Sequence, residues 1–208
     1  SVTIVVGDYH VKINCGPGSV SGWSDDDSFV SGGADFDFGT PENEMDVSCD
    51  NAAPAAVYNS VRREHHSYSF SDAPDGRYQL RLHFYDGWTD GSGRNMKFVA
   101  EGNQTLLENF NIESEAGALK KALVQAFTVT VSGGDGLQLE CQAGGGDDVF
   151  LSAVEIVGLP DPGYVTFTNP AAGSAIQAGK MTTVTWTDND EDAMNDQWIL
   201  EYTTDGGV

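Results

Sequence analysis

The 208-residue sequence predicts an all-β protein folded as an antiparallel β-sandwich. Short runs of β-branched and aromatic residues recur along the chain, and turns such as CGPG, DAPDG and SGGDG separate them. Glycine is frequent, with 25 residues, and proline is scarce, with 7, which suits many short strands joined by tight turns. Because 39% of the residues are hydrophobic, the chain can also build a packed core.

The expected strands follow these runs in chain order. They lie at Val2–Val6, Tyr9–Asn14, Ala56–Arg62, Ser67–Ser71, Arg77–Tyr85, Asn95–Ala100, Leu123–Val131, Gly136–Cys141 and Val149–Val157. Ile112–Ala126 differs, because alanine, leucine, glutamate and lysine dominate it while Gly117 interrupts it. We expect a loop or a short helical turn there, leading into a strand.

The segment Arg77–Trp88, RYQLRLHFYDGW, carries the clearest strand signal in the chain. Its apolar residues alternate with polar ones, so one face of the strand carries Tyr78, Leu80, Leu82 and Phe84. This pattern predicts a half-buried strand that delivers Asp86 and Trp88 to the surface at its end. An indole beside a carboxylate can hold a sugar, since the ring packs on the apolar face of a pyranose and the carboxylate accepts its hydroxyls. A core tryptophan that merely follows a core strand is the alternative.

The charge of the chain restricts its partners. The net charge is −22, from 32 acidic and 10 basic residues, which disfavours nucleic acids and anionic membrane surfaces and leaves uncharged ligands and cations. Many aspartates lie in runs such as DDD and GGGDD, which form either a solvated surface or calcium sites. No run matches the twelve-residue calcium-loop pattern, and we expect no required cofactor, with structural calcium as the alternative.

The three cysteines, Cys15, Cys49 and Cys141, have no CxxC spacing, so a zinc site is poorly supported. One disulfide with one free thiol, or three buried thiols, are both compatible with the sequence. No stretch is long and apolar enough to span a bilayer, and the N-terminus does not have the pattern of a signal peptide. These features are typical of a mature fragment or an excised segment.

A boundary is expected at LPDPG, Leu159–Gly163, because two prolines and a glycine in five residues cannot continue a central strand. We therefore expect one domain over residues 1–158, a linker over 159–163 and a partial second module over 164–208. Strand patterns in the second part lie at Val165–Thr168, Thr182–Thr187 and Gln197–Thr203. These residues are too few for an independent two-sheet sandwich.

An ordered series of landmarks runs from Val11 to Gly158. KINCG precedes GWSDDDSF and SGGADFDFG, VYNSVRR leads into HSYSFSDAPDGRYQLRLHFYDGW, and AFTVTV precedes GLQLEC and DDVFLSAVEIVG. In this order and spacing the first part of the chain resembles a malectin-type carbohydrate-binding domain. The resemblance implies a jelly-roll-like β-sandwich and the binding of oligosaccharides without catalysis.

The resemblance also implies where a ligand would bind, namely in loops at one end of the sandwich. Position by position, the family's aromatic after the LHF strand falls on Trp88, and its early loop aromatic falls on Phe36 or Phe38. The family's aspartate before the last strand falls on Asp147, with Asp148 adjacent.

One position departs from the family pattern. A further aromatic expected after the VY segment falls on Arg63, which can hydrogen-bond to hydroxyls or to a carboxylate or sulfate of a glycan. This departure puts the family's glucose disaccharide preference in doubt. Asp86, as a hydroxyl acceptor, and Tyr85 complete the set of candidate sugar-binding residues.

The tail carries a second resemblance. TNPAAGSAIQAGKMTTVTW and LEYTTDGG resemble the start of an immunoglobulin-like module common in secreted, multi-domain bacterial proteins. Such modules act as spacers, and Trp186 would then be a core residue.

Together these observations favour a non-catalytic carbohydrate-binding module in a secreted bacterial protein. It would capture a poly- or oligosaccharide, a glucan first of all, and target a covalently linked polysaccharide-degrading enzyme. A structural or adhesive sandwich, calcium-stabilised or not, is the alternative. A glycosidase that uses Asp86 and Asp147 as paired carboxylates is the third hypothesis.

Overall fold

The computed structural model describes residues 8–88, 94–144, 148–160, 165–169 and 183–188. The chain divides into two compact units, residues 1–159 and 160–208. The expected strands Val2–Val6 and Gln197–Thr203 lie outside the described residues. In the second unit, β12 (Val165–Asn169) and β13 (Thr185–Asp188) form an antiparallel pair.

The first sheet of the first unit has five strands. Their spatial order is β2 (Ser24–Asp25), β1 (His10–Asn14), β11 (Ala153–Leu159), β5 (Gly76–Phe84) and β8 (Leu123–Val131). All neighbours in this sheet are antiparallel except β1 and β2, which are parallel.

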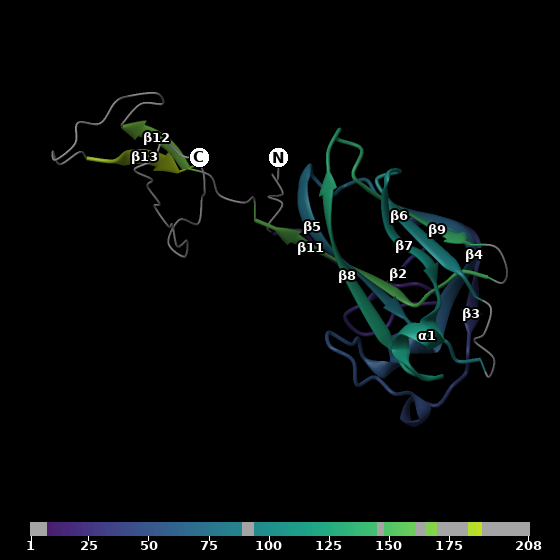
Figure 1. Ribbon diagram of the computed structural model, residues 1–208. Helices are drawn as coiled ribbons and strands as arrows, with labels where there is room; N and C mark the ends of the chain where they lie inside the picture. Colours follow the sequence, from purple (N-terminus) through teal and green to yellow (C-terminus); the bar gives the residue numbers. More distant parts are fainter. Residues whose placement is uncertain (1–7, 89–93, 145–147, 161–164, 170–182, 189–208) are drawn as a thin grey trace. The chain divides into compact units, whose positions relative to one another are not determined.

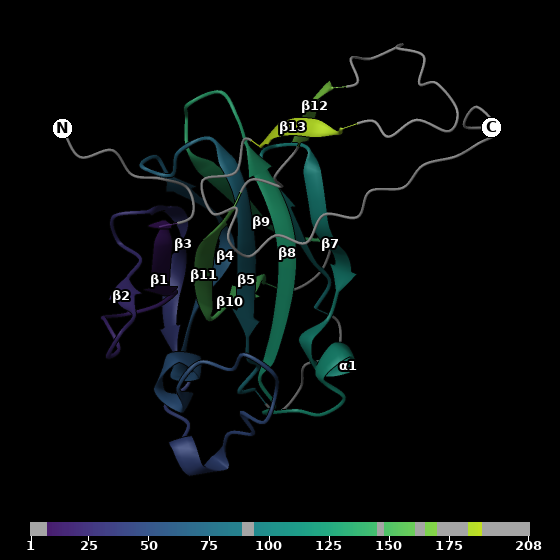
Figure 2. The ribbon, with the colours of Figure 1, turned by 90° about the vertical axis from the view of Figure 1, so that its left-hand side faces the viewer.

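The second sheet has six strands. Their main order is β10 (Phe150–Leu151), β4 (Ser60–Phe70), β9 (Leu137–Ala143), β6 (Met96–Ala100) and β7 (Gln104–Phe110), and β3 (Val30–Asp37) also pairs with β4. The two sheets face each other in both ribbon views (Figures 1 and 2). The predicted antiparallel β-sandwich is confirmed.

The main core fills the space between the sheets. The four apolar residues of the Arg77–Trp88 pattern that were expected on one face are fully buried, namely Tyr78, Leu80, Leu82 and Phe84. They pack in one cluster with residues of the second sheet, including Tyr68, Leu139 and Phe98. Each such side chain contributes about 1.5–3 kcal/mol through burial, so this strand is held firmly in register.

The opposite face of β5 is also covered near the strand's end. His83 and Tyr85 are fully buried, because Trp23 and Tyr58 pack over them in a second cluster. Much of this cover comes from residues 38–59, which contain the short helices η2 (Glu42–Glu44) and η3 (Ala55–Asn59). This segment and α1 (Ile112–Ala116) lie at the same end of the sandwich (Figures 1 and 2).

Four expected elements differ in detail from the structure. Ala56–Arg62 begins as η3 before β4 starts. Ile112–Ala126 divides into α1, which ends at Gly117 with a left-handed φ of 76°, and the start of β8. Val149–Val157 breaks at Ser152, so that β10 joins one sheet and β11 the other. Ser67–Ser71 belongs to the same strand, β4, as the end of Ala56–Arg62. The sequence did not predict β2, β3 or β7.

The structure shows three thiols and no disulfide among the three cysteines, and of the three expected buried thiols Cys49 is only partly buried. Cys15, Cys49 and Cys141 are all free, and Cys15 and Cys141 lie in the main core. Burial raises the pKa of both core thiols well above the ordinary value.

Among the described residues, no helix is long and apolar enough to cross a membrane.

A buried polar network ties the loop before β3 to β4. The Arg62 guanidinium donates two hydrogen bonds to the Asp26 carboxylate, from Nε at 3.0 Å and from Nη2 at 2.5 Å. The Tyr68 hydroxyl donates to the same carboxylate at 2.8 Å. Burial raises the pKa of Asp26, while the hydrogen bonds from Arg62 and Tyr68 oppose that rise. The network thus holds a loop without regular structure against the sheet that carries Arg63.

Removal of one partner of this pair should strongly destabilise the fold. Arg62→Met leaves the buried Asp26 carboxylate without its guanidinium, so we expect the free energy of unfolding to fall by about 3–5 kcal/mol. Urea unfolding followed by circular dichroism measures the change. Arg77→Met, which removes a partly exposed guanidinium, is the matched control and should cost less than about 1 kcal/mol. Equal losses in the two variants would contradict a special role for the buried pair.

The buried histidine at the end of β5 should make stability depend on pH. His83 shares a hydrogen bond of 3.1 Å with the Tyr58 hydroxyl, and burial lowers the pKa of His83 to about 4. The unfolded chain has a histidine pKa of about 6.5, so the unfolded state binds more protons between these values. Stability from this group is therefore fully present above about pH 6.5 and is lost as the pH falls towards 4.

His83→Asn should make the decline in stability between pH 6.5 and 4 shallower, measured by urea unfolding at several pH values. His66, whose pKa burial also lowers to about 4, leaves part of the decline in place. His65→Asn is the control, because the His65 side chain is 64% exposed. An unchanged slope in His83→Asn would contradict the assignment.

Candidate functional site

Four aromatic side chains from three separate parts of the first unit form an aromatic cluster. Phe36 and Phe38 lie at the end of β3, Trp88 follows β5, and Phe150 lies in β10. Trp88 meets Phe36 at 5.5 Å and Phe150 at 5.4 Å between ring centroids, and Phe38 lies 6.0 Å from Phe150. All three pairs have the edge-to-face geometry that aromatic rings favour.

The members of the cluster differ in exposure. Phe150 is fully buried, Phe36 and Phe38 are partly buried, and Trp88 is 36% exposed. Trp88 therefore rests on an apolar base while part of its side chain faces solvent. This agrees with the expectation that the Arg77–Trp88 strand delivers an indole to the surface.

Asp86 occupies a position below Trp88 rather than beside it at the surface. Its Oδ1 accepts a hydrogen bond of 3.0 Å from the Trp88 backbone N–H, and its Oδ2 accepts one from Arg94 Nη1. Both side chains of this ion pair are buried. The sequence placed Asp86 at the surface, whereas the structure buries it, with its carboxylate in contact with the Trp88 amide and Arg94.

Arg94 adds a second restraint on the indole. Its guanidinium carbon lies 4.8 Å from the Trp88 ring centroid and 4.5 Å from that of Phe150. Contacts of this kind between a cation and an aromatic ring are attractive, more so when water is excluded. Arg94 and Phe150 were not among the sequence-predicted site residues. Phe150 had a signal in its position beside the predicted Asp147 and Asp148, whereas Arg94 had none.

Tyr85 lies in the interior. It is fully buried and packs against Phe38 at 5.5 Å and Tyr58 at 6.4 Å. This buried position differs from the one expected of a sugar contact, because residues 38–59 cover the side chain that follows Phe84. Asp147 lies outside the described residues.

Arg63 and Asp148 form a polar pair next to the aromatic cluster. Arg63 Nη1 lies 3.5 Å from Asp148 Oδ2, and each of these side chains is 32% exposed. The Arg63 guanidinium carbon lies 5.5 Å from the Phe36 ring centroid. The structure thus brings four of the predicted residues together, namely Arg63, Asp148, Phe36 and Trp88.

A bulge in β4 directs Arg63 to this place. Glu64 has a left-handed φ of 66°, and the pairing of β3 with β4 shifts register between Gly32 and Ala34. Gly33 fits opposite the bulge because it lacks a side chain, since a Cβ there would lie 2.8 Å from the Arg63 carbonyl oxygen. Such bulges re-aim side chains at sheet edges and beside binding sites.

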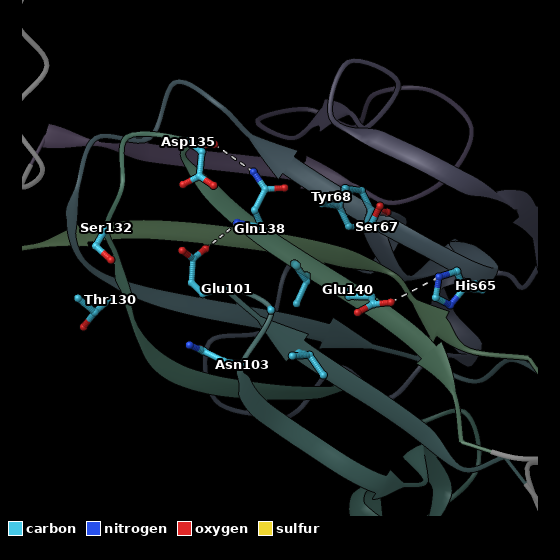
Figure 3. A pocket seen from close by; sticks show the side chains of 13 residues that line it. His65, Ser67, Tyr68, Glu101, Asn103, Thr130, Ser132, Asp135, Gln138 and Glu140 are labelled. Carbon is cyan, nitrogen blue, oxygen red and sulfur yellow. Dashed lines mark hydrogen bonds and ion pairs between the residues drawn. The ribbon is translucent and has the colours of Figure 1, made fainter.

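A second candidate is a hollow of about 580 Å³ beside the second sheet, which residues of β4, β6 and β9 line together with Thr130 of β8 and Ser132 (Figure 3). Its lining includes the acidic residues Glu101, Asp135 and Glu140. His65 also lines it, and His65 Nε2 lies 3.6 Å from Glu140 Oε1. Tyr68 also borders it, but its ring is buried in the core and offers no stacking surface. The aromatic cluster differs in this respect, because the Trp88 ring is partly exposed there.

No metal site is evident in the part of the chain that the structure describes, because no three histidine, cysteine, aspartate or glutamate side chains are grouped to hold an ion. Structural calcium remains a hypothesis from the sequence alone.

Comparisons with known proteins place the first unit in a family. The family model described as Malectin domain matches residues 9–148. Among solved structures, the ANXUR1 extracellular domain from Arabidopsis thaliana has a TM-score of 0.61 at 16% identity, covering 70% of this chain and 47% of that chain. A structure of the plant peptide RALF23 in complex with FER and LLG2 has a TM-score of 0.59 at 18% identity, with coverages of 70% and 47%.

A bacterial enzyme has a similar fold within a longer chain. Bacteroides uniformis β-glucuronidase has a TM-score of 0.57 at 19% identity, covering 74% of this chain and 18% of that chain. The chain thus spans about half the length of the plant structures and under a fifth of the enzyme. At these identities the likeness concerns the fold. No curated protein sequence matches the chain.

Removal of the Asp86 carboxylate should loosen Trp88. Asp86→Ala deletes the acceptor of the Trp88 amide and the carboxylate that faces the buried Arg94 charge, at a cost of about 3–5 kcal/mol to the local structure. Hydrogen exchange of peptides containing residues 84–88 should rise accordingly. Asp37→Ala is the control, since its carboxylate is exposed at the end of β3 and, among the described residues, accepts a hydrogen bond of 2.7 Å from the nearby Gly39 amide. Unchanged exchange at Trp88 in Asp86→Ala would contradict the positioning role.

Proposed function

This chain belongs to the malectin domain family, and we propose that its first unit is a non-catalytic carbohydrate-binding module whose ligand stacks on Trp88. The observation that carries the proposal is the partly exposed indole, held on a rigid aromatic base beside a polar pair. The indole supplies an apolar surface for a pyranose ring, and Arg63 with Asp148 supplies hydrogen-bonding groups at its border.

Each candidate residue then has a defined part. Trp88 is the platform, and Phe36 supports it and borders the ligand. Arg63 donates to sugar oxygens and Asp148 accepts from sugar hydroxyls. Phe38, Phe150, Tyr85, Asp86 and Arg94 hold the platform from below. Asp147 keeps the sugar-binding assignment that the family resemblance implies.

The expected affinity is moderate. Burial of about 100 Å² of apolar sugar and ring surface is worth roughly 2–3 kcal/mol, and a few hydrogen bonds add about 1 kcal/mol each. After the cost of ordering the ligand, the binding free energy should be about −8 to −4 kcal/mol, which corresponds to micromolar to millimolar dissociation constants.

The proposal extends to the parent protein. We propose that the module is secreted by a bacterium and directs a covalently linked polysaccharide-degrading enzyme to its substrate, with a glucan as the first ligand to test. The similar fold within Bacteroides uniformis β-glucuronidase supports the combination of such a sandwich with a glycan-acting enzyme. Residues 164–208 would begin an immunoglobulin-like spacer. The chain's net charge of −22 supports the exclusion of nucleic acid and anionic lipid as partners.

The buried position of Asp86 argues against hydrolysis by the first unit. A paired-carboxylate mechanism needs both groups beside the scissile bond, and the Asp86 carboxylate instead faces Arg94 and the Trp88 amide. A binding role requires no such pair.

Trp88→Ala should weaken binding to any glycan that the full chain retains. We expect a loss of about tenfold to a hundredfold, corresponding to the apolar contact removed, measured by affinity electrophoresis against soluble polysaccharides and then by titration calorimetry. Circular dichroism should show that the variant remains folded. Glu140→Gln in the hollow on the second sheet is the matched control.

Two results would contradict the proposal. One is the failure of the wild-type chain to bind any glycan, which would favour the structural or adhesive alternative. The other is unchanged binding by Trp88→Ala together with weakened binding by Glu140→Gln, which would move the site to the hollow.

A further inference from the structure

We propose that Arg63 and Asp148 together bind two neighbouring hydroxyls of a neutral sugar, and that this pair makes the site select neutral glycans over acidic ones. The inference rests on the proposed sugar-binding function and names the ligand class of that site. The observation behind it is a donor and an acceptor that lie side by side, both partly exposed, next to the platform.

The Arg63 guanidinium and the Asp148 carboxylate use only part of their hydrogen-bonding capacity on each other. Their separation of 3.5 Å between Arg63 Nη1 and Asp148 Oδ2 exceeds that of an ordinary charge-assisted hydrogen bond. Arg63 Nε is buried and has no hydrogen-bond partner among the described residues, so it is closed to a ligand. A ligand would instead meet the two terminal nitrogens of Arg63, whose contacts with Asp148 at 3.5 Å and Glu64 at 3.9 Å are long, and the Asp148 carboxylate, which has about four acceptor sites.

A vicinal diol complements this arrangement. Each sugar hydroxyl can both donate and accept, so one hydroxyl can accept from Arg63 while its neighbour donates to Asp148. The two hydroxyls are adjacent on the sugar ring, as the donor and acceptor are adjacent on the protein. A single charged group on a ligand can satisfy Arg63 but places a negative charge next to Asp148.

The pair is aligned with the platform. Arg63 packs over Phe36, whose ring in turn meets Trp88, and Asp148 lies two residues before Phe150. Phe150 is the residue directly opposite Arg63 where β10 pairs with β4. A sugar ring that stacks on Trp88 would therefore turn an edge with its hydroxyls towards the pair.

The backbone holds Arg63 in this place before any ligand binds. The left-handed Glu64 and the close approach of Gly33 fix the bulge that directs the Arg63 side chain. Preorganisation of this kind lowers the ordering cost of binding. It also makes the spacing of donor and acceptor a property of the fold, which is what selectivity for a diol requires.

The local charge disfavours acidic ligands. Glu64 lies 3.9 Å from the second Arg63 terminal nitrogen, so Arg63 is flanked by two carboxylates, its own neighbour and Asp148. The three groups carry a net charge of −1, within a chain of net charge −22. A uronate or sulfated sugar would meet like charges there, whereas a neutral sugar would not.

The test compares two oligosaccharides of one linkage, a neutral glucan and the same glucan oxidised to carboxylates at carbon 6. Titration calorimetry with the full chain should show at least about tenfold tighter binding of the neutral ligand. This difference in affinity should become smaller at higher salt, because salt screens the repulsion between the ligand carboxylates and those of the protein. Asp148→Asn should weaken binding of the neutral glucan and reduce the ratio between the affinities for the two ligands. Arg63→Lys, which keeps the charge and loses the planar fork, should weaken neutral binding.

Asp27→Asn is the control, because it changes the same charge on a side chain that is 82% exposed. Equal or tighter binding of the oxidised glucan by the wild-type chain would overturn the inference while leaving the sugar-binding function in place. So would an effect of Asp148→Asn no larger than that of Asp27→Asn. Failure of the wild-type chain to bind either ligand or any other glycan would overturn the function itself, and the inference with it.

Discussion

The buried ion pair between Asp86 and Arg94 fixes the end of the sandwich that carries the proposed sugar site. Two charges removed from water are costly unless they meet, so the chain before residue 89 and the chain from residue 94 must come together here. Asn111 Nδ2 donates to the Arg94 carbonyl at 2.9 Å, and Asn111 Oδ1 accepts the Ser114 amide at the start of α1. The end of β5 and the starts of β6 and α1 thus meet at one interaction. The same interaction sets the position of Trp88.

The burial of basic residues also affects the charge of the protein surface. The chain has 10 lysines and arginines, and two of them, Arg62 and Arg94, are buried in ion pairs with aspartates, Arg62 with Asp26 and Asp35 and Arg94 with Asp86. The charges of these two guanidinium groups are thus offset by aspartates and do not attract an anionic partner at the surface. Among the described acidic residues only Asp26, Asp86 and Glu155 are buried, so most of the acidic excess of this part of the chain lies at the surface. A module of this kind repels polyanions at long range and leaves neutral polymers unaffected, which agrees with a site that recognises hydroxyls.

The sequence predicted the parts of this fold that depend on local pattern. The alternation at Tyr78–Phe84 is as expected because a strand buried on one face must repeat every two residues. β3 was missed because VSGGADFD lacks that alternation, and its glycines serve the bulge in β4. The burial of Tyr85 and the role of Asp86 depend on residues 38–59 and on Arg94, which pattern alone does not connect to them. Likewise, Val149–Val157 has the pattern of one strand but changes sheets at Ser152.

The packing of Trp88 has two opposite effects on the expected affinity of the proposed site. Because its ring already meets Phe36, Phe150 and Arg94, the indole loses little conformational freedom when a sugar binds. The same contacts cover much of the side chain, so only part of it is left for a ligand. A single sugar unit would therefore be held briefly. On a polymer with many equivalent units, a linked enzyme would still remain near its substrate, because release from one unit leaves the next within reach.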